Sequence, residues 1–393
     1  MPLVRASFLI VTVAACTGAA GGTAWAQAPP PAFPAAVGSS PLFVPTVRFD
    51  ATAPARAQTP AGGSSAFNPD ISVIGNFIAV GGKNPMNDEP ALQLSEAEFA
   101  FQAAVDPYSR ADFFVALGPE GAELEEGFIT FTALPANLLL KAGKMRAQFG
   151  KMNTLHTHRL PSADRSIVTD NLVGGDEGLS DAGVSLSHLI PSGTVFVELT
   201  GEVYAGRSDV FESEDRSKLV YLGRARAYRD LAESTNLDVG FSYAHGPAPG
   251  GGEPADPDPD AGFGRDLYGV DLTLRYRPLR QAIYRRLNVR TELVWSRQDL
   301  ASDLGATAFG FYALAEYQFA RRWYVGGRLD RSGRAVDGDL VDKGGSAFLT
   351  FWPTEFSQIR GQYRHISYAE GVTGNEVLFQ INFSIGAHGA HVF

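Results

Sequence analysis

Apolar and polar residues alternate along most of this 393-residue chain from about residue 70 onward. A period of two is typical of β-strands that have one apolar side and one polar side. The clearest segment is 376–385, whose odd-numbered members are Val377, Phe379, Ile381, Phe383 and Ile385. The same test predicts sixteen strands, at approximately 70–79, 92–105, 111–118, 125–133, 137–145, 181–190, 194–205, 218–229, 236–245, 266–277, 287–297, 308–319, 323–331, 345–352, 357–368 and 376–387.

The connections between these strands alternate between short turns and longer polar loops, with only 278–286 rather long for a turn. The predicted loops are 80–91, 119–124, 146–180, 206–217, 246–265, 298–307, 332–344 and 369–375. Strands of about ten residues are long enough to cross a bilayer when tilted. The pattern therefore predicts an all-β fold: a transmembrane antiparallel β-barrel of about 16 strands, with a long third extracellular loop and both termini in the periplasm.

A soluble β-sandwich or β-solenoid is the alternative fold. No fixed repeat period is visible, and sixteen strands are unusual for one sandwich domain. Aromatic residues also fall in the outward register, several of them near strand ends, where membrane-interface girdles occur. Examples are Phe99, Phe113, Phe241, Trp295 and Phe379. Beyond the N-terminus no run of eighteen apolar residues exists, which excludes a helical membrane protein.

The N-terminus predicts export. Residues 1–26 have the pattern of a signal peptide, with Arg5, a short apolar core and an A-x-A site at Ala24–Ala26. A lipobox that ends at Cys16 is the alternative reading of this segment. Residues 27–66 are rich in Pro and Ala and predict a disordered periplasmic segment, and 67–393 predict the barrel.

Composition narrows the function classes. The chain has 33 basic and 43 acidic residues and a net charge of −10, which becomes −11 once the signal peptide takes Arg5 away. A mildly acidic surface argues against nucleic-acid binding. Cleavage after Ala26 would remove Cys16, the single cysteine, and exported barrels commonly lack cysteine. No catalytic constellation emerges, so we expect no enzyme and no cofactor.

Three stretches carry a family resemblance: "FNPDISVIGNF" from Phe67, "LLLKAGKMRAQFGKMNTLHTHRLPSADR" from Leu138, and the tail "INFSIGAHGAHVF". In these the chain resembles the phosphate-selective porin O and P group in the broad sense. The resemblance implies a sixteen-stranded barrel, trimeric, that conducts ions or small polar solutes. Phosphate-selective members use an arginine ladder and a lysine cluster that are not matched here position by position, so phosphate selectivity is not implied.

Two alternative functions stay open. One is an outer-membrane receptor or transporter for a specific ligand, TonB-dependent in type and linked to a metal or an anion. Such receptors carry a folded plug domain before the barrel, whereas only about 40 low-complexity residues precede it here. The other is a structural barrel. In every case the expected partners are outer-membrane lipid and the barrel-assembly machinery, engaged through the last strand ending in Phe393.

The long third loop is the candidate pore constriction. The resemblance implies that this loop folds inward, and charges at a constriction set ion preference. Its carboxylates would then face arginines of the later strands. The candidate set is Asp164, Asp170, Asp176, Glu177, Arg328, Arg360 and Arg364. A solvated outer loop with ordinary charges is the alternative.

The strand register also predicts which charges face the lumen. The main candidates are Glu96, Glu98, Lys141, Arg224, Arg226, Arg275 and Arg290. Acidic residues prevail in the early strands, so the lumen is expected to carry either a transverse field or neutralising cross-strand pairs. His156 and His158 form an H-x-H pair in the third loop that could share a metal, but further ligands are not identifiable and a hydrogen-bonding role is favoured.

Overall fold

The computed structural model describes residues 69–87, 89–119, 121–175, 177–213, 215–249, 264–299 and 305–386. The predicted signal peptide, Cys16, the segment 27–66 and Phe393 lie outside these residues, so the expectations about them stay predictions.

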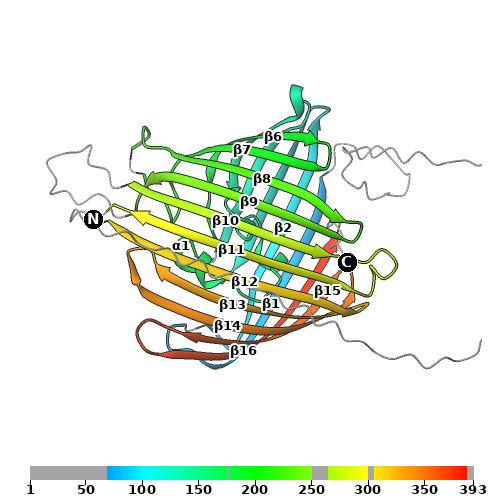
Figure 1. The fold of residues 1–393 in the computed structure, drawn as a ribbon, viewed down its shortest axis with the longest axis vertical. Coiled ribbons are helices and arrows are strands. Elements are labelled where there is room, and N and C mark those ends of the chain that lie inside the picture. The colour runs from blue at the N-terminus through cyan, green and yellow to red at the C-terminus, as the bar shows by residue number, and fades with distance from the viewer. Residues whose placement is uncertain are drawn as a thin grey trace, which may run out of the picture. The chain divides into compact units, whose positions relative to one another are not determined.

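The described residues form one closed ring of sixteen antiparallel strands in chain order (Figure 1). The strands are β1 (Asp70–Lys83), β2 (Leu92–Asp106), β3 (Ser109–Gly118), β4 (Gly121–Phe131), β5 (Leu138–Arg146), β6 (Ser180–Ser192), β7 (Val195–Tyr204), β8 (Val220–Ala232), β9 (Thr235–Pro247), β10 (Gly264–Tyr276), β11 (Arg286–Gln298), β12 (Ala306–Ala320), β13 (Trp323–Arg334), β14 (Asp337–Thr354), β15 (Ser357–Ser367) and β16 (Thr373–Gly386). The first and last strands close the ring, with Ser72 opposite Gly386 and Lys83 opposite Asn375. The predicted fold class and strand number are confirmed.

One predicted loop, 332–344, is wrong, because β13 and β14 continue through it and join at a short turn after Arg334. Asp342 pairs with Ser332, and Val341 pairs with Gly333. The loop 119–124 is likewise wrong, since β4 begins at Gly121. In both places the strands keep pairing where the residues are polar or small, so the hydrophobic alternation fades before the strand ends.

The two faces of each strand differ sharply. Phe241, Leu329 and Phe379 point outward and are 51%, 65% and 44% exposed, whereas their chain neighbours Ser242 and Gln380 are 0% and 1% exposed. Alternate side chains of a strand point to opposite faces, so this pattern gives an apolar outer surface and a polar interior. Within the described residues, no helix combines the length and the apolar character needed to cross a bilayer.

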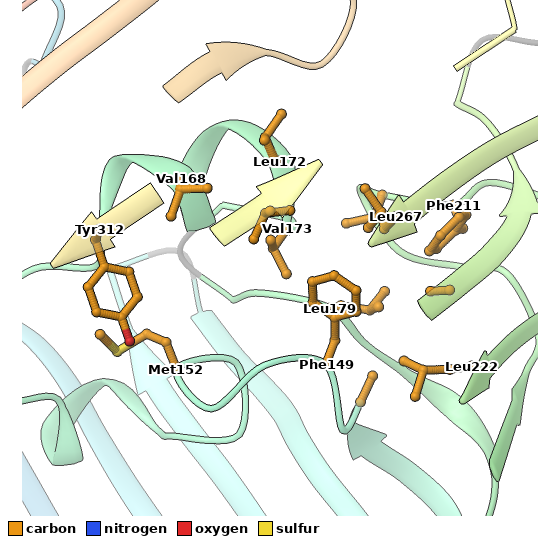
Figure 2. Packing of buried hydrophobic residues seen from close by; sticks show 14 of the residues in the cluster. Phe149, Met152, Val168, Leu172, Val173, Leu179, Phe211, Leu222, Leu267 and Tyr312 are labelled. Atoms are coloured by element: carbon orange, nitrogen blue, oxygen red, sulfur yellow. The ribbon is translucent and has the colours of Figure 1, made fainter. Parts of the chain in front are cut away.

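The interior is partly filled by the chain itself. Loop 3, defined here as residues 147–179 between β5 and β6, contains η2 (Thr157–Arg159) and α1 (Ile167–Leu172), while η1 (Pro135–Asn137) lies between β4 and β5. α1 packs against β11, β12, β13 and β14. Figure 2 shows apolar side chains of loop 3 beside those of the wall, and the labelled loop members are Phe149, Met152, Val168, Leu172, Val173 and Leu179.

Candidate functional site in the barrel lumen

The first half of loop 3 is anchored by carboxylates of the barrel wall. The backbone N–H of Gln148 donates to Glu202 of β7 at 2.8 Å. Further along, the N–H groups of Lys151 and Met152 donate to one oxygen of Glu292 on β11, at 3.1 and 2.7 Å. Buried backbone N–H groups need acceptors, and here the wall supplies them. The loop therefore crosses the lumen between β7 and β11.

The second half of loop 3 is anchored by arginines. Asp164 lies 3.0 Å from the guanidinium of Arg328 and 3.1 Å from that of Arg364, and it accepts a hydrogen bond from Gln362 at 2.6 Å. Arg360 donates to the carbonyl oxygen of Leu160 at 3.1 Å. The structure thus brings one of the candidate carboxylates together with two of the candidate arginines, and the third arginine holds the loop through its backbone.

The other candidate carboxylates of the third loop lie elsewhere. Asp170 is exposed on α1, and Glu177 is exposed near the start of β6. The carbonyl oxygen of Glu177 accepts a hydrogen bond from Arg146. Asp176 lies outside the described residues. Asp164 is therefore a candidate carboxylate for which the structure shows ion pairs with the candidate arginines.

The candidate lumen charges on β8 to β11 form a paired network. The carboxylate of Asp238 lies 2.7 Å from the ammonium group of Lys151, 2.8 Å from the guanidinium of Arg226 and 3.4 Å from that of Arg275. Arg224 pairs with Asp271 at 2.8 Å. The side chains of Arg226 and Arg275 are 37% and 31% exposed, whereas that of Arg328 is 1% exposed. Solvent in the lumen therefore reaches the first two arginines and not the third.

Two further candidates stand out on the wall. The ammonium group of Lys141 lies 4.7 Å from the centre of the Phe128 ring, a cation–π contact. Arg290 on β11 buries its Nε and Nη1 atoms with no hydrogen-bond partner among the described residues. The wall consequently combines neutralised pairs with a guanidinium group that has two buried nitrogens without hydrogen bonds.

A β-bulge shapes the wall where β3 pairs with β4. In the pairing of β3 with β4, Phe114 faces Glu126 and Val115 faces Leu124, so Glu125 is the extra residue. A bulge breaks the strict alternation and re-aims side chains. As a result the consecutive residues Glu125 and Glu126 both reach His156 of loop 3, where Glu125 lies 2.6 Å from Nδ1 and Glu126 lies 2.8 Å from Nε2.

The glutamates of β2 complete this corner of the lumen. Glu98 lies 2.9 Å from His156 Nδ1 and 3.4 Å from His158 Nδ1, and Glu96 lies 3.7 Å from His158 Nδ1. Glu98, Glu126 and both histidines also line a cavity of about 390 Å³ between loop 3 and strands β2 to β5. The two histidines that the sequence singles out thus meet four glutamates, of which Glu125 and Glu126 were not candidates.

Comparison with known proteins places the chain beside one relative in particular. No family model matches the chain. A protein of Aquifex aeolicus, described as uncharacterized, is 30% identical to it, and the alignment covers 84% of this chain and 80% of that protein. The chain belongs to that protein's family.

Solved structures show which fold this family has. The anion-selective porin from Comamonas acidovorans matches with a TM-score of 0.54 and 11% identity, over 81% of this chain and 100% of that chain. OprB of Pseudomonas putida matches with a TM-score of 0.54 and 12% identity, over 81% and 94%. The outer membrane channel DcaP of Acinetobacter baumannii gives 0.53 and 10%, over 81% and 96%. At such identities the likeness concerns the fold, so the family has the barrel fold of outer-membrane porins.

The bulge residues of this family member could not be found from the sequence. Strict alternation puts one of two consecutive glutamates on the outer face, and nothing in "ELEEGF" marks which residue is the extra one. The pair of adjacent acidic residues inside this strand is the signal that the sequence offers, since a charge on the lipid face is costly.

Proposed function

We propose that this protein is a passive diffusion channel for ions and small polar solutes in the bacterial outer membrane. The observation that carries this proposal is the closed ring of strands, apolar outside and charged inside, with a cavity of about 390 Å³ beside loop 3. A charged wall inside an apolar shell suits a water-filled path across a bilayer, because lipid tails cannot solvate such groups. The porin fold of the neighbouring structures supports it.

Loop 3 forms the constriction in this proposal. It contacts carboxylates of β4, β7 and β11 and arginines of β13 and β15, and Asn382 of β16 donates a hydrogen bond to the carbonyl oxygen of His158. A loop held on so many sides leaves a narrow path, so the channel admits small solutes. Arg328, Arg360 and Asp164 act by fixing the loop, since their buried charges are out of reach of passing ions.

The membrane orientation and assembly follow the same proposal. Both ends of the described barrel lie on the rim of the short turns, which we assign to the periplasm. We further propose a homotrimer. One solved neighbour, OmpT of Vibrio cholerae, is described in a trimer form (TM-score 0.53, 8% identity). The outward residues Gly223, Ala225 and Ala227 of β8 would permit close packing of two barrels.

Planar-bilayer recording tests the proposal. Folded wild-type protein should give discrete, ohmic conductance steps in KCl, and a variant with residues 149–177 replaced by a short Gly-Ser linker should give larger steps. A gel shift on boiling confirms beforehand that each sample is a folded barrel.

The remaining outcomes separate the alternatives. Silence of both proteins would overturn the channel and favour a structural barrel. Silence of the wild type with conductance in the loop-deleted variant would also overturn passive diffusion, and would favour a ligand-gated receptor or transporter.

A further inference from the structure

Five buried titratable side chains meet in the corner between loop 3, β2 and β4. We call His156, His158, Glu96, Glu98 and Glu125 the His–Glu cluster. These five residues are 6%, 5%, 8%, 1% and 8% exposed. Burial of several carboxylates at one point is unfavourable unless cations or hydrogen-bond donors compensate them.

Hydrogen bonds within the protein do not fully compensate the cluster. Glu98 Oε2 and Glu96 Oε1 are buried and accept no hydrogen bond from the described residues. His156 Nδ1 faces Glu125 at 2.6 Å and Glu98 at 2.9 Å, yet an imidazole nitrogen carries at most one proton. Arg146 pairs with Glu125 at 3.2 Å. Glu98 therefore aims its Oε2 atom at two imidazoles, and this atom accepts no hydrogen bond from the described residues.

The geometry suits a metal ion. One nitrogen of His156 and one oxygen each of Glu98 and Glu125 lie within 4.8 Å of one another, and the same holds for Glu96, Glu98 and His158. Ligands that each lie about 2.1 Å from a tetrahedral ion are roughly 3.4 Å apart. The observed contacts from 2.6 to 3.7 Å fall on either side of that value, so shifts of less than about 1 Å would seat an ion.

The surroundings supply two features that metal sites commonly have. The Nε2 atom of His156 lies 2.8 Å from Glu126, and a ligating histidine usually donates its second ring N–H to a carboxylate, which orients the ring. Glu98, His156 and His158 also line the cavity of about 390 Å³, so an ion in the lumen can reach them.

We propose that the His–Glu cluster binds a divalent first-row transition-metal ion such as Zn²⁺. His156 Nδ1, Glu98 and Glu125 are the primary ligands. His158 and Glu96 lie beside the ion, because they form a second group with the same Glu98. Imidazole combined with carboxylate favours such ions over Mg²⁺ and Ca²⁺, which prefer oxygen ligands alone. Because the histidines belong to loop 3 and the glutamates to β2 and β4, the ion would fasten the loop to the wall. The site stands whether or not the barrel conducts.

Calorimetric titration of the untagged, folded barrel with Zn²⁺ tests this proposal. The wild type should bind one Zn²⁺ per chain in the presence of millimolar Mg²⁺. Glu98→Gln should weaken binding by roughly 10-fold to 100-fold or more. Glu202→Gln is the matched control. Like Glu98, Glu202 is a buried carboxylate of the wall next to loop 3, where it accepts the backbone N–H of Gln148, but it lies outside the cluster. It should bind Zn²⁺ as the wild type does.

Equal Zn²⁺ binding by the wild type and Glu98→Gln, or none by the wild type, would overturn the site. The cluster would then be a hydrogen-bonded imidazolium that serves structure alone. If Glu98→Gln gives no folded barrel, the visible spectrum of Co²⁺ added to the wild type decides. Absorption bands of protein-bound Co²⁺ that one equivalent of Zn²⁺ abolishes support the site, and a spectrum of hydrated Co²⁺ refutes it.

Discussion

Asp164 joins loop 3 to two strands at once, because its carboxylate contacts Arg328 of β13 and Arg364 of β15. Each arginine also keeps a second partner. Arg328 pairs with Asp330 at 2.7 Å, and Arg364 pairs with Glu376 at 2.7 Å. The second partners belong to the wall and would stay in place if the loop moved. Loss of the Asp164 carboxylate would therefore weaken the attachment of the loop while these wall pairs remain.

Asp164→Asn should therefore destabilise the barrel moderately. Removing one partner of a buried pair costs roughly 3–5 kcal/mol, and the retained wall pairs should reduce the loss to about 2 kcal/mol. Guanidinium unfolding followed by tryptophan fluorescence measures the change. Asp209→Asn, at an exposed position between β7 and β8, is the control and should change stability by less than about 0.5 kcal/mol. Equal effects of the two substitutions would contradict the anchoring role.

At single positions the sequence is informative wherever the alternation holds. The register predicts that Glu98, Arg224 and Arg328 face the interior, and the structure buries all three side chains. It could not predict which loop carboxylate meets the arginines, since that depends on the path of loop 3 across the lumen. Nor could it predict Glu125 as a neighbour of His156, because a one-residue bulge moves it out of register.

Loop 3 is an element that does not stabilise itself. Its helix α1 has six residues, and a helix so short has almost no stability alone. Val168 and Leu172 of this helix are each 1% exposed within the apolar cluster of the lumen. The helix therefore forms because the wall of β11 to β14 offers apolar surface to bury.

Leu172→Ala should loosen this element. Truncation of a buried leucine costs about 2–5 kcal/mol through lost burial and the cavity left behind. We expect a lower thermal unfolding temperature, and noisier, larger conductance steps in planar bilayers. Leu329→Ala, at an outward position that is 65% exposed, is the control and should leave the conductance unchanged. A quiet, unaltered conductance for Leu172→Ala would show that α1 does not border the path.

The strands were predictable as elements because a tilted strand with lipid on one side must alternate in polarity. The same criterion failed between β13 and β14. There Asp337, Asp339 and Asp342 interrupt the apolar positions, although the strands remain paired. Polar residues in that hairpin indicate contact with water, and they do not end the strands. A rule based on apolar positions therefore predicts strands that are too short there.

Across the whole lumen, charge is unevenly distributed. Arg226, Arg275 and Lys151 gather around Asp238 on β8 to β10, and the His–Glu cluster lies on β2 and β4. In a ring of sixteen strands β2 stands opposite β10, so the two groups face each other across the lumen. We propose that this unequal distribution of charge on facing walls creates a transverse field across the lumen.

The double substitution Arg226→Gln/Arg275→Gln should shift the reversal potential toward cation preference. It removes two positive charges that solvent reaches and leaves Asp238 with Lys151 alone. The shift should shrink at high salt, because the Debye length falls from about 10 Å at 0.1 M to about 3 Å at 1 M. Arg216→Gln, at an exposed position between β7 and β8, is the control and should produce no shift. An unchanged potential in the double variant would mean that ions do not pass this wall.

The antiparallel pairing of β1 with β16 restricts how such a chain can lengthen or shorten during evolution. With one strand more or one fewer, the last strand would run in the same direction as the first. The seam would then have to be parallel, with the slanted hydrogen bonds and slightly weaker pairing of parallel strands. Lineages descended from this chain can therefore keep an unbroken antiparallel ring only by gaining or losing whole hairpins, two strands at a time.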